Sequence, residues 1–477
     1  MASTSSLNGM LKSKRRHERP TKSRALKSVN PRTLKPSVPP PDALLLYPPV
    51  LPAGLKPRSA SSQTHETHQY FDVSTHIVPA AYPRLTPYVS FSELERRAGG
   101  FAGAETKESR SLRAKQISEQ LSRLRENYAK GKLVSDGSEN RLLWNVVNRY
   151  SRKGSLPANK TRVTLLLAHA NGFPKETWEP FLVQLCKKLE GQDVFVDEAW
   201  AIEAVQHGDS CLINQEKLGV LFDWSDHSRD LLNFLLRYLP DSSASAPPHP
   251  VHLPRLPEEV GLERIKSGLA GRTLIAIGHS FGGCTSTLAA VNAPNLFSSL
   301  VLVDPVIVPQ YNDRTSDVLH LARGAVQRRE TWSSREEAHT LFRSSPFFGA
   351  WDPKVLELYV EHGLAAEDNG VRLKMPGLQE SVVFVDMQVS YETFELLDRL
   401  DDKISLLWVL ATKGHKLNGP EDERYLVWRR PANCENVCIE SSGHLIAQEA
   451  PTELAHEIMI FLFAKYARGS DVRRSNL

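Results

Sequence analysis

The chain of 477 residues carries 59 lysine and arginine residues against 55 acidic residues, and 41% of its residues are hydrophobic. This composition excludes a disordered chain and a collagen-like chain, and five cysteines over such a length exclude a small disulfide-stapled scaffold. The length suits one large domain or two to three of average size. The formal charge of +4 is unevenly placed, because residues 1–40 hold ten basic residues and one acidic residue, which leaves 49 basic and 54 acidic residues in the remainder.

The first segment, residues 1–65, is rich in basic residues, proline and serine. Thirteen of the 31 prolines lie in the first 90 residues, so this segment is a poor candidate for packing, and we predict a disordered basic arm. Two alternatives stay open, a mitochondrial transit peptide and an anionic-surface or nuclear patch at residues 12–16. No nucleic-acid motif accompanies these charges, so no nucleic-acid partner is predicted.

Residues 66–468 show a different pattern, in which short apolar runs alternate with helical periodicity. Such alternation is typical of a mostly parallel sheet covered by helices on both faces, an α/β fold. The predicted strands are residues 71–78, 141–150, 164–168, 199–205, 274–277, 300–303, 405–410 and 437–440. The predicted helices are residues 105–130, 178–189, 225–239, 281–290 and 451–466.

Two stretches interrupt this alternation. Residues 240–258 form a loop rich in proline and serine. Residues 305–400 lie between two predicted core strands, have helical patterns and are rich in aromatic residues. An insertion of this length within a sheet predicts a helical lid, although ordinary helical packing accounts for the same pattern. Residues 469–477 follow the last helix as a C-terminal tail.

The segment from Gly278 to Gly282 reads Gly-His-Ser-Phe-Gly and stands between a predicted strand and a predicted helix. A G-x-S-x-G motif in this context predicts a sharp turn that presents a nucleophilic serine, Ser280. The helix that begins at Phe281 directs its free N–H groups toward the place where negative charge develops.

A serine hydroxyl needs a base, and in this type of fold the chain order is serine, acid, histidine. His444 follows the last predicted strand and precedes the last helix, which makes it the candidate base. Two positions compete for the acid. Asp304 ends the strand at residues 300–303, whereas Glu421, Asp422 and Glu423 lie in a loop after the strand at residues 405–410. We favour Asp304, because the tip of a strand faces the site.

The oxyanion of the reaction needs a second backbone N–H, which the loop after residues 164–168 would supply. We predict the Phe173 amide as this donor, together with that of Phe281, and keep Asn171 as the alternate. The polar turn around His207 is interpreted as structural, with contact between His207 and the pocket as the second interpretation.

Targeting signals and cofactor sites are sparse. No apolar run reaches the ~18 residues that span a bilayer, and the first residues lack the apolar core of a secretory signal, so neither a transmembrane segment nor secretion is predicted. The ending Ser475-Asn476-Leu477 matches the peroxisomal Ser-Lys-Leu address at two of three positions and departs from it at the middle one. Cys434 and Cys438 have no second pair at zinc spacing, so neither a metal nor a cofactor is predicted.

Over residues 66–468 the chain resembles the α/β-hydrolase superfamily, and more closely the fungal hydrolases of secondary-metabolite pathways. These include the peroxisomal hydrolases of host-selective toxin biosynthesis and the mycophenolyl-CoA hydrolases. The matching segments are Phe71–Arg84, HANGFPKETWEP at 169–180, GHSFGG at 278–283, VDPVIVP at 303–309 and SSGHLIAQEAP at 441–451. The resemblance implies a Ser–Asp–His triad whose acid directly follows the strand at residues 300–303, which favours Asp304. It also implies a peroxisomal location through an import receptor, with cytoplasmic and mitochondrial locations as alternatives.

Together these features predict a serine hydrolase that cleaves an ester or thioester of a hydrophobic acyl substrate, a small molecule of which an acyl-CoA is one kind. Ser280, His444 and Asp304 would act as nucleophile, base and acid. Two alternatives stay open: an acyltransferase that uses the same triad, and a non-catalytic ligand-binding protein of the same fold.

Overall fold

A computed structural model describes most of the chain. The described residues are 16–20, 28–45, 49–52, 55, 57–58, 66–97, 106–154, 160–241, 249–310, 314–414 and 419–467. The predicted C-terminal tail, and with it the Ser475-Asn476-Leu477 ending, lies outside these residues.

An eight-stranded sheet forms the centre of the molecule, with the strand order β1-β2-β4-β3-β5-β6-β10-β11. The pairs β1–β2 and β2–β4 are antiparallel, and the remaining pairs are parallel. The strands are β1 (Phe71–Pro79), β2 (Trp144–Arg152), β3 (Thr161–Ala168), β4 (Val194–Ile202), β5 (Leu274–His279), β6 (Ser299–Val303), β10 (Ser405–Ala411) and β11 (Cys434–Ile439). The sheet is therefore mostly parallel, and all eight predicted strands are present with shifted ends.

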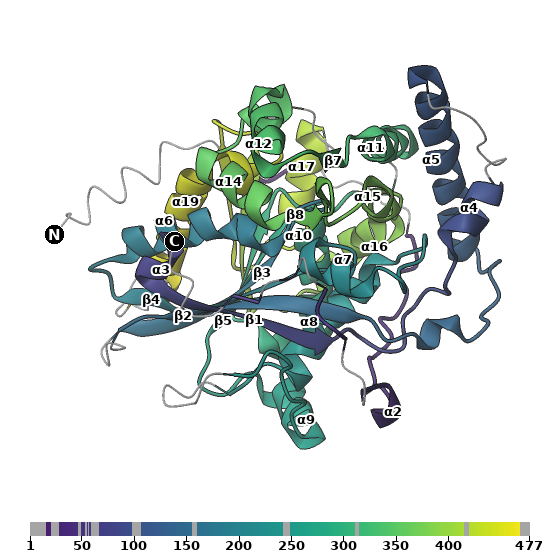
Figure 1. Ribbon diagram of the computed structural model, residues 1–477. Coiled ribbons are helices and arrows are strands. Elements are labelled where there is room, and N and C mark those ends of the chain that lie inside the picture. The colour runs from purple at the N-terminus through teal and green to yellow at the C-terminus, as the bar shows by residue number, and fades with distance from the viewer. Residues whose placement is uncertain are drawn as a thin grey trace.

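Helices cover both faces of this sheet (Figure 1). Alternate side chains of each central strand enter different clusters, as in β3, where Leu165 and Leu167 pack on one face and Leu166 on the other. The helices are α2 (Asp42–Leu45), α3 (Thr67–Tyr70), α4 (Phe91–Arg97), α5 (Lys107–Ala129), α6 (Glu179–Leu189), α7 (Gly208–Asn214), α8 (Trp224–Arg237), α9 (Glu258–Ser267), α10 (Phe281–Asn292), α17 (Pro420–Val427), α18 (Ile446–Glu449) and α19 (Pro451–Tyr466). Helices α6 and α19 lie on one face, and α8 and α10 lie on the other. The sequence did not predict α7, which lies in the polar turn, or α9, which follows the proline-rich loop.

The insertion, residues 305–400, joins β6 to β10 and is drawn in green in Figure 1. Its helices are α11 (Thr315–Gln327), α12 (Arg335–Ser344), α13 (Pro346–Gly349), α14 (Pro353–His362), α15 (Gly377–Phe384) and α16 (Gln388–Leu396). It also contains an antiparallel sheet of β7 (Thr331–Trp332), β9 (Gly370–Leu373) and β8 (Leu364–Glu367). The sequence predicted helices alone, because strands of two to four residues are too short to show a period of two.

The N-terminal segment differs from the prediction of a disordered arm over residues 1–65. Residues 28–38 lie against the domain, where Arg32 bridges two helices. The Arg32 guanidinium is 2.7 Å from a carboxylate oxygen of Asp223, which precedes α8, and 2.7 Å from one of Glu392 in α16. Part of the basic charge in this segment therefore pairs with buried carboxylates of the fold itself.

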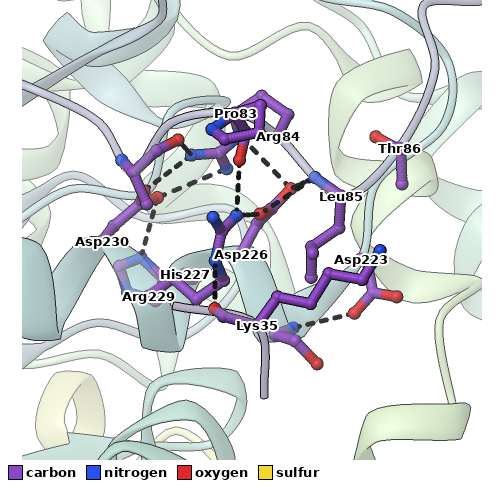
Figure 2. Close-up of polar contacts among 12 residues, drawn as sticks. Lys35, Pro83, Arg84, Leu85, Thr86, Asp223, Asp226, His227, Arg229 and Asp230 are labelled. Atoms are coloured by element: carbon purple, nitrogen blue, oxygen red, sulfur yellow. Dashed lines mark hydrogen bonds and ion pairs between the residues drawn. The ribbon is translucent and has the colours of Figure 1, made fainter. Parts of the chain in front are cut away.

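Arginine side chains of the domain donate to carbonyl groups of the same segment, and Figure 2 shows the contact of Arg229 with Lys35. Arg229 in α8 donates through Nε to the Lys35 carbonyl at 2.8 Å and through Nη1 to Asp226 Oδ1 at 2.6 Å. Arg84 lies between Asp226 and Asp230 and donates to Asp230 Oδ1 at 2.6 Å. A proline-rich chain leaves its carbonyl groups unpaired, so buried arginines can bind it without any regular secondary structure.

Candidate active site

Ser280 stands at the sharp turn between β5 and α10. Its backbone angles are φ 56° and ψ −117°, a strained conformation for a residue with a side chain. The flanking glycines are needed for close approach. A Cβ atom at Gly278 would lie 2.4 Å from the Gly282 carbonyl oxygen, and one at Gly282 would lie 2.4 Å from that of Ala168. The turn therefore accepts no larger residue at either position and fixes Ser280 at the end of the strand.

His444 lies between β11 and α18 and contacts two side chains. Its Nε2 is 2.9 Å from the Ser280 hydroxyl oxygen, and its Nδ1 is 2.6 Å from Asp304 Oδ2. This geometry assigns the proton of the neutral imidazole to Nδ1, which donates to the carboxylate, and leaves Nε2 to accept from the hydroxyl. The side chains of His444 and Asp304 are 35% and 20% exposed, so solvent reaches this row of hydrogen bonds.

The carboxylate beside His444 belongs to Asp304, which directly follows β6. The Ala411 amide donates to its second oxygen, Oδ1, at 3.0 Å and fixes the carboxylate plane. The competing carboxylates, Glu421, Asp422 and Glu423, lie in the first turn of α17. Glu421 pairs there with Arg424 at 3.6 Å, and Glu423 lies 3.2 Å from His17.

Sequence comparison places the chain in a known family. Residues 165–457, more than half of the chain, match the profile of the alpha/beta hydrolase family. The chain belongs to this family. The fold predicted from the sequence, a mostly parallel sheet flanked by helices, is thereby confirmed, as is the resemblance to the α/β-hydrolase superfamily.

Three fungal proteins are among the relatives of this chain. The type I acyl-CoA thioesterase mpaH of Penicillium brevicompactum is 28% identical over 218 residues, which cover 45% of this chain and 43% of that protein. The peroxisomal membrane protein LPX1 of Saccharomyces cerevisiae is 23% identical over 343 residues, 66% of this chain and 80% of that protein. The abhydrolase domain-containing protein ACTT2 of Alternaria alternata is 34% identical over 101 residues, 21% of this chain and 37% of that protein. The chain thus aligns with less than half of the thioesterase it resembles.

A solved structure of one relative extends the fold comparison. The peroxisomal alpha-beta-hydrolase Lpx1 of Saccharomyces cerevisiae superposes with a TM-score of 0.58 at 19% identity, covering 84% of this chain and 92% of that one. At this identity the match establishes the fold. Membership of the alpha/beta hydrolase family is thus shown by sequence, and the relatives of the chain include proteins named acyl-CoA thioesterases.

The predicted oxyanion loop, residues 169–174, leaves the end of β3 and leads into a short 3-10 helix, η2 (Lys175–Trp178). The first turn of α10 lies against its start, because Gly282 packs on the carbonyl groups of Ala168 and His169. The loop that carries Phe173 and the helix start that carries Phe281 are thus neighbours in space. Their amides remain the predicted oxyanion donors.

Two buried polar side chains brace this loop. His207 donates through Nε2 to Asn171 Oδ1 at 3.0 Å, and Asn171 Nδ2 donates to the Glu380 carbonyl at 3.1 Å. Burial, with His169 as a second cause, lowers the pKa of His207 well below its usual value, so its imidazole is neutral and has one N–H to donate. The side chains of Asn171 and His207 are therefore occupied with each other and with the insertion.

A group of five buried charged side chains lies directly beyond the oxyanion loop, and we call it the Lys175 cluster. The Lys175 ammonium is 3.0, 3.2 and 2.8 Å from carboxylate oxygens of Glu176, Glu203 and Asp209. Lys374, from the insertion, is 2.5 Å from the other oxygen of Asp209. None of the five side chains is more than 10% exposed. Sequence reasoning missed this cluster, since Lys374 stands far from the other members in the chain.

The pKa values of the cluster follow from burial and mutual contact. Burial and the neighbouring carboxylates outweigh the effect of Lys175 and raise the pKa of Glu203 to about 7. Burial alone would raise the pKa of Asp209 as well, but its two lysine partners hold it below the usual value. Three carboxylates against two ammonium groups leave one excess negative charge, which a proton on Glu203 removes.

His279, the residue before the nucleophile, is a further residue that sequence reasoning missed. Its Nε2 donates to the His444 carbonyl oxygen at 2.8 Å, and its side chain is fully buried. Burial and the nearby His444 lower the pKa of His279 to about 3, so its imidazole stays neutral. Ser280 and His279 thus hold the side chain and the main chain of His444 from one short turn.

Aromatic side chains of the insertion pack on the oxyanion loop. The ring of Phe173 makes edge contacts with Trp351 and Tyr359, at centroid distances of 5.2 and 6.2 Å. Leu445, next to His444, belongs to the same apolar cluster. The insertion therefore brings an apolar surface to both loops that flank Ser280.

Within the part of the chain that the structure describes, no three His, Cys, Asp or Glu side chains gather so as to hold a metal ion. None of the helices among these residues has the length and apolar character to cross a membrane.

Proposed function

We propose that this protein is a serine hydrolase that cleaves an ester or thioester of a hydrophobic acyl group. The observation that carries the proposal is the double contact of His444, 2.9 Å from the Ser280 hydroxyl and 2.6 Å from Asp304. A hydroxyl, an imidazole and a carboxylate in this order form the charge arrangement that nucleophilic acyl transfer needs.

The reaction proceeds in two halves. His444 Nε2 accepts the Ser280 proton as Oγ bonds to the substrate carbonyl carbon, and the imidazolium that forms is stabilised by Asp304. Collapse of the tetrahedral intermediate expels the alcohol or thiol, which receives that proton from His444. Water then attacks the acyl-enzyme by the same steps, with His444 as base and then acid, and releases the carboxylic acid.

Two backbone amides, those of Phe173 and Phe281, are the proposed donors to the oxyanion. Phe281 supplies the free N–H at the start of α10, and Phe173 lies in the loop beside it. Preformed donors matter because they face the charge that appears only in the transition state, and loss of one typically costs roughly 2.7–4 kcal/mol.

The apolar surface of the insertion supports a hydrophobic acyl group. Phe173, Trp351 and Tyr359 belong to one aromatic cluster at the oxyanion loop. Relatives named acyl-CoA thioesterases support a thioester as the bond that is cleaved and an acyl-CoA as one substrate. We propose that the insertion acts as the lid over this acyl group.

Covalent labelling tests the proposal. A fluorophosphonate probe should label the full chain on Ser280, and the Ser280→Ala variant should lose the label. Burst kinetics with an activated ester distinguish an enzyme from a binding protein, and product analysis with added alcohol or amine distinguishes hydrolysis from acyl transfer. Unchanged labelling of the Ala variant would remove Ser280 from the mechanism.

We also propose a peroxisomal location, which the LPX1 relative supports through its name. Microscopy of the full chain, with and without residues 475–477, tests this. Peroxisomal signal that disappears on removal of the three residues is the expected result, and unchanged distribution contradicts it.

A further inference from the structure

The insertion contacts the oxyanion loop at three separate points. Its aromatic residues surround the Phe173 ring, and its Glu380 carbonyl accepts the Asn171 side chain. The third contact is polar and indirect, because Lys374 reaches Asp209, which in turn holds Lys175, the residue that follows the loop and Pro174. The loop is thus held between the core and the insertion.

The third contact consists of two buried ion pairs that share one carboxylate. Asp209 uses one oxygen for Lys175, at 2.8 Å, and the other for Lys374, at 2.5 Å. Lys175 is fully buried, and its backbone N–H also donates to Glu203 at 3.3 Å. Charge-assisted hydrogen bonds in a buried site are strong and directional, so a shift of Lys374 is passed to Lys175 through one carboxylate.

The backbone around Asp209 is built to permit this arrangement. Gly208, at the start of α7, has φ +46°, and a Cβ atom there would lie 2.0 Å from Glu203 Oε1. Ser210 donates its N–H to the other Glu203 oxygen at 3.0 Å. The turn therefore brings Glu203 and Asp209 to Lys175 together, which leaves Asp209 free to face the insertion.

We propose that Lys374 is a positioning residue of the insertion that sets the oxyanion loop through Asp209 and Lys175. The inference rests on the proposed function, since it assumes that the Phe173 amide binds the oxyanion. The insertion then does more than cover the site. When it is packed on the core, it holds the oxyanion loop in the conformation that binds the transition state. Such donors must be fixed closely, because a displacement of about 1 Å can cost a factor of 10² in rate.

The test compares two lysines of the insertion that each pair with a carboxylate outside the insertion. Lys374→Met removes the contact with Asp209, and Lys354→Met removes the exposed ion pair with Glu66, which is a matched control. Full-length variants are assayed with a p-nitrophenyl ester, and their affinity is measured for a trifluoromethyl ketone, whose adduct with Ser280 carries the oxyanion. Lys374→Met should lower kcat and the affinity for the ketone by about tenfold each, with KM within about twofold, because only the transition state uses the loop amide. Lys354→Met should change none of the three.

A double-mutant cycle identifies the path of the effect. If Lys374 acts through Asp209, the variant with both Asp209→Asn and Lys374→Met should lose no more ketone affinity than Asp209→Asn alone. Should Lys374→Met fold poorly, Lys374→Gln keeps a donor to Asp209 and should retain more of the kcat and ketone affinity than Met does. Additive losses, or equal kcat and ketone affinity in the two Met variants, overturn the inference. A wild-type chain that neither hydrolyses the ester nor binds the ketone instead contradicts the proposed function.

Discussion

Two polar groups lie on either side of the oxyanion loop, and they differ in how far solvent reaches their charged side chains. The row of Ser280, His444 and Asp304 is partly open, with the His444 side chain 35% exposed. The Lys175 cluster is closed, and the Lys175 side chain is fully buried. In the proposed mechanism protons move between the members of the open row, whereas the side chains of the closed cluster hold one another in buried ion pairs. Strongly shifted pKa values gather in the closed cluster, which shows that such shifts mark fixed scaffolding as readily as reacting groups.

The largest effect of a substitution is expected in the open row, on the kcat of an Asp304 variant. Asp304→Asn should lower kcat by about 10⁴-fold, because the amide cannot stabilise the imidazolium and favours the wrong tautomer of His444. Glu421→Gln, in the competing acidic turn, is the matched control and should leave kcat unchanged. Steady-state ester hydrolysis measures both. A large loss in the Glu421 variant with normal turnover in the Asp304 variant would move the acid to α17.

In the Lys175 cluster, the largest effect of a substitution is expected on the free energy of unfolding. Lys175→Met leaves three buried carboxylates with Lys374 alone and should lower the free energy of unfolding by about 3–5 kcal/mol. Lys187→Met removes an exposed ion pair with Glu66 and should cost about 0–1 kcal/mol. Chemical denaturation of both variants measures the difference. Similar midpoints for the two would mean that the cluster is not a tight unit.

The proton on Glu203 gives the closed cluster a pH dependence of its own. Because the pKa of Glu203 is raised to about 7 in the fold, its contribution to stability is fully present below the usual pKa near 4.5 and is lost as pH rises to 7. Glu203→Gln stays neutral, so its unfolding free energy relative to wild type should rise over this window by up to about 3 kcal/mol. Denaturation curves at several pH values test this. Parallel pH profiles for the two proteins would show that Glu203 titrates normally.

The two groups also differ in how far the sequence predicts them. Ser280 is marked by its glycines and His444 by its place after the last strand, because strand, turn and helix dictate both locally. Asp304 follows from the carboxyl ends of parallel strands meeting at one edge. No sequence motif identifies Lys374, because its pairing with Asp209 depends on how the insertion packs on the rest of the domain. The N-terminal segment shows the same limit: proline and charge predict disorder, but they say nothing of the arginines of α8 that bind its carbonyl groups.

His279 shares a property with each group. Its side chain is fully buried, as in the closed cluster, and it donates a hydrogen bond to the main chain of His444 in the open row. His279→Leu removes the hydrogen bond to the His444 carbonyl and should lower kcat about tenfold with little change in KM, since the loop that carries the base loses one anchor. His279→Gln, which keeps a donor of similar reach, should recover part of the loss. His76→Leu is the matched control, because His76 is also buried and its Nδ1 lies 2.8 Å from a backbone carbonyl, that of Pro250. His76 belongs to β1, the edge strand of the sheet, and does not contact His444. If both Leu variants lose kcat equally, the loss reflects general destabilisation, and His279 has no special hold on the base.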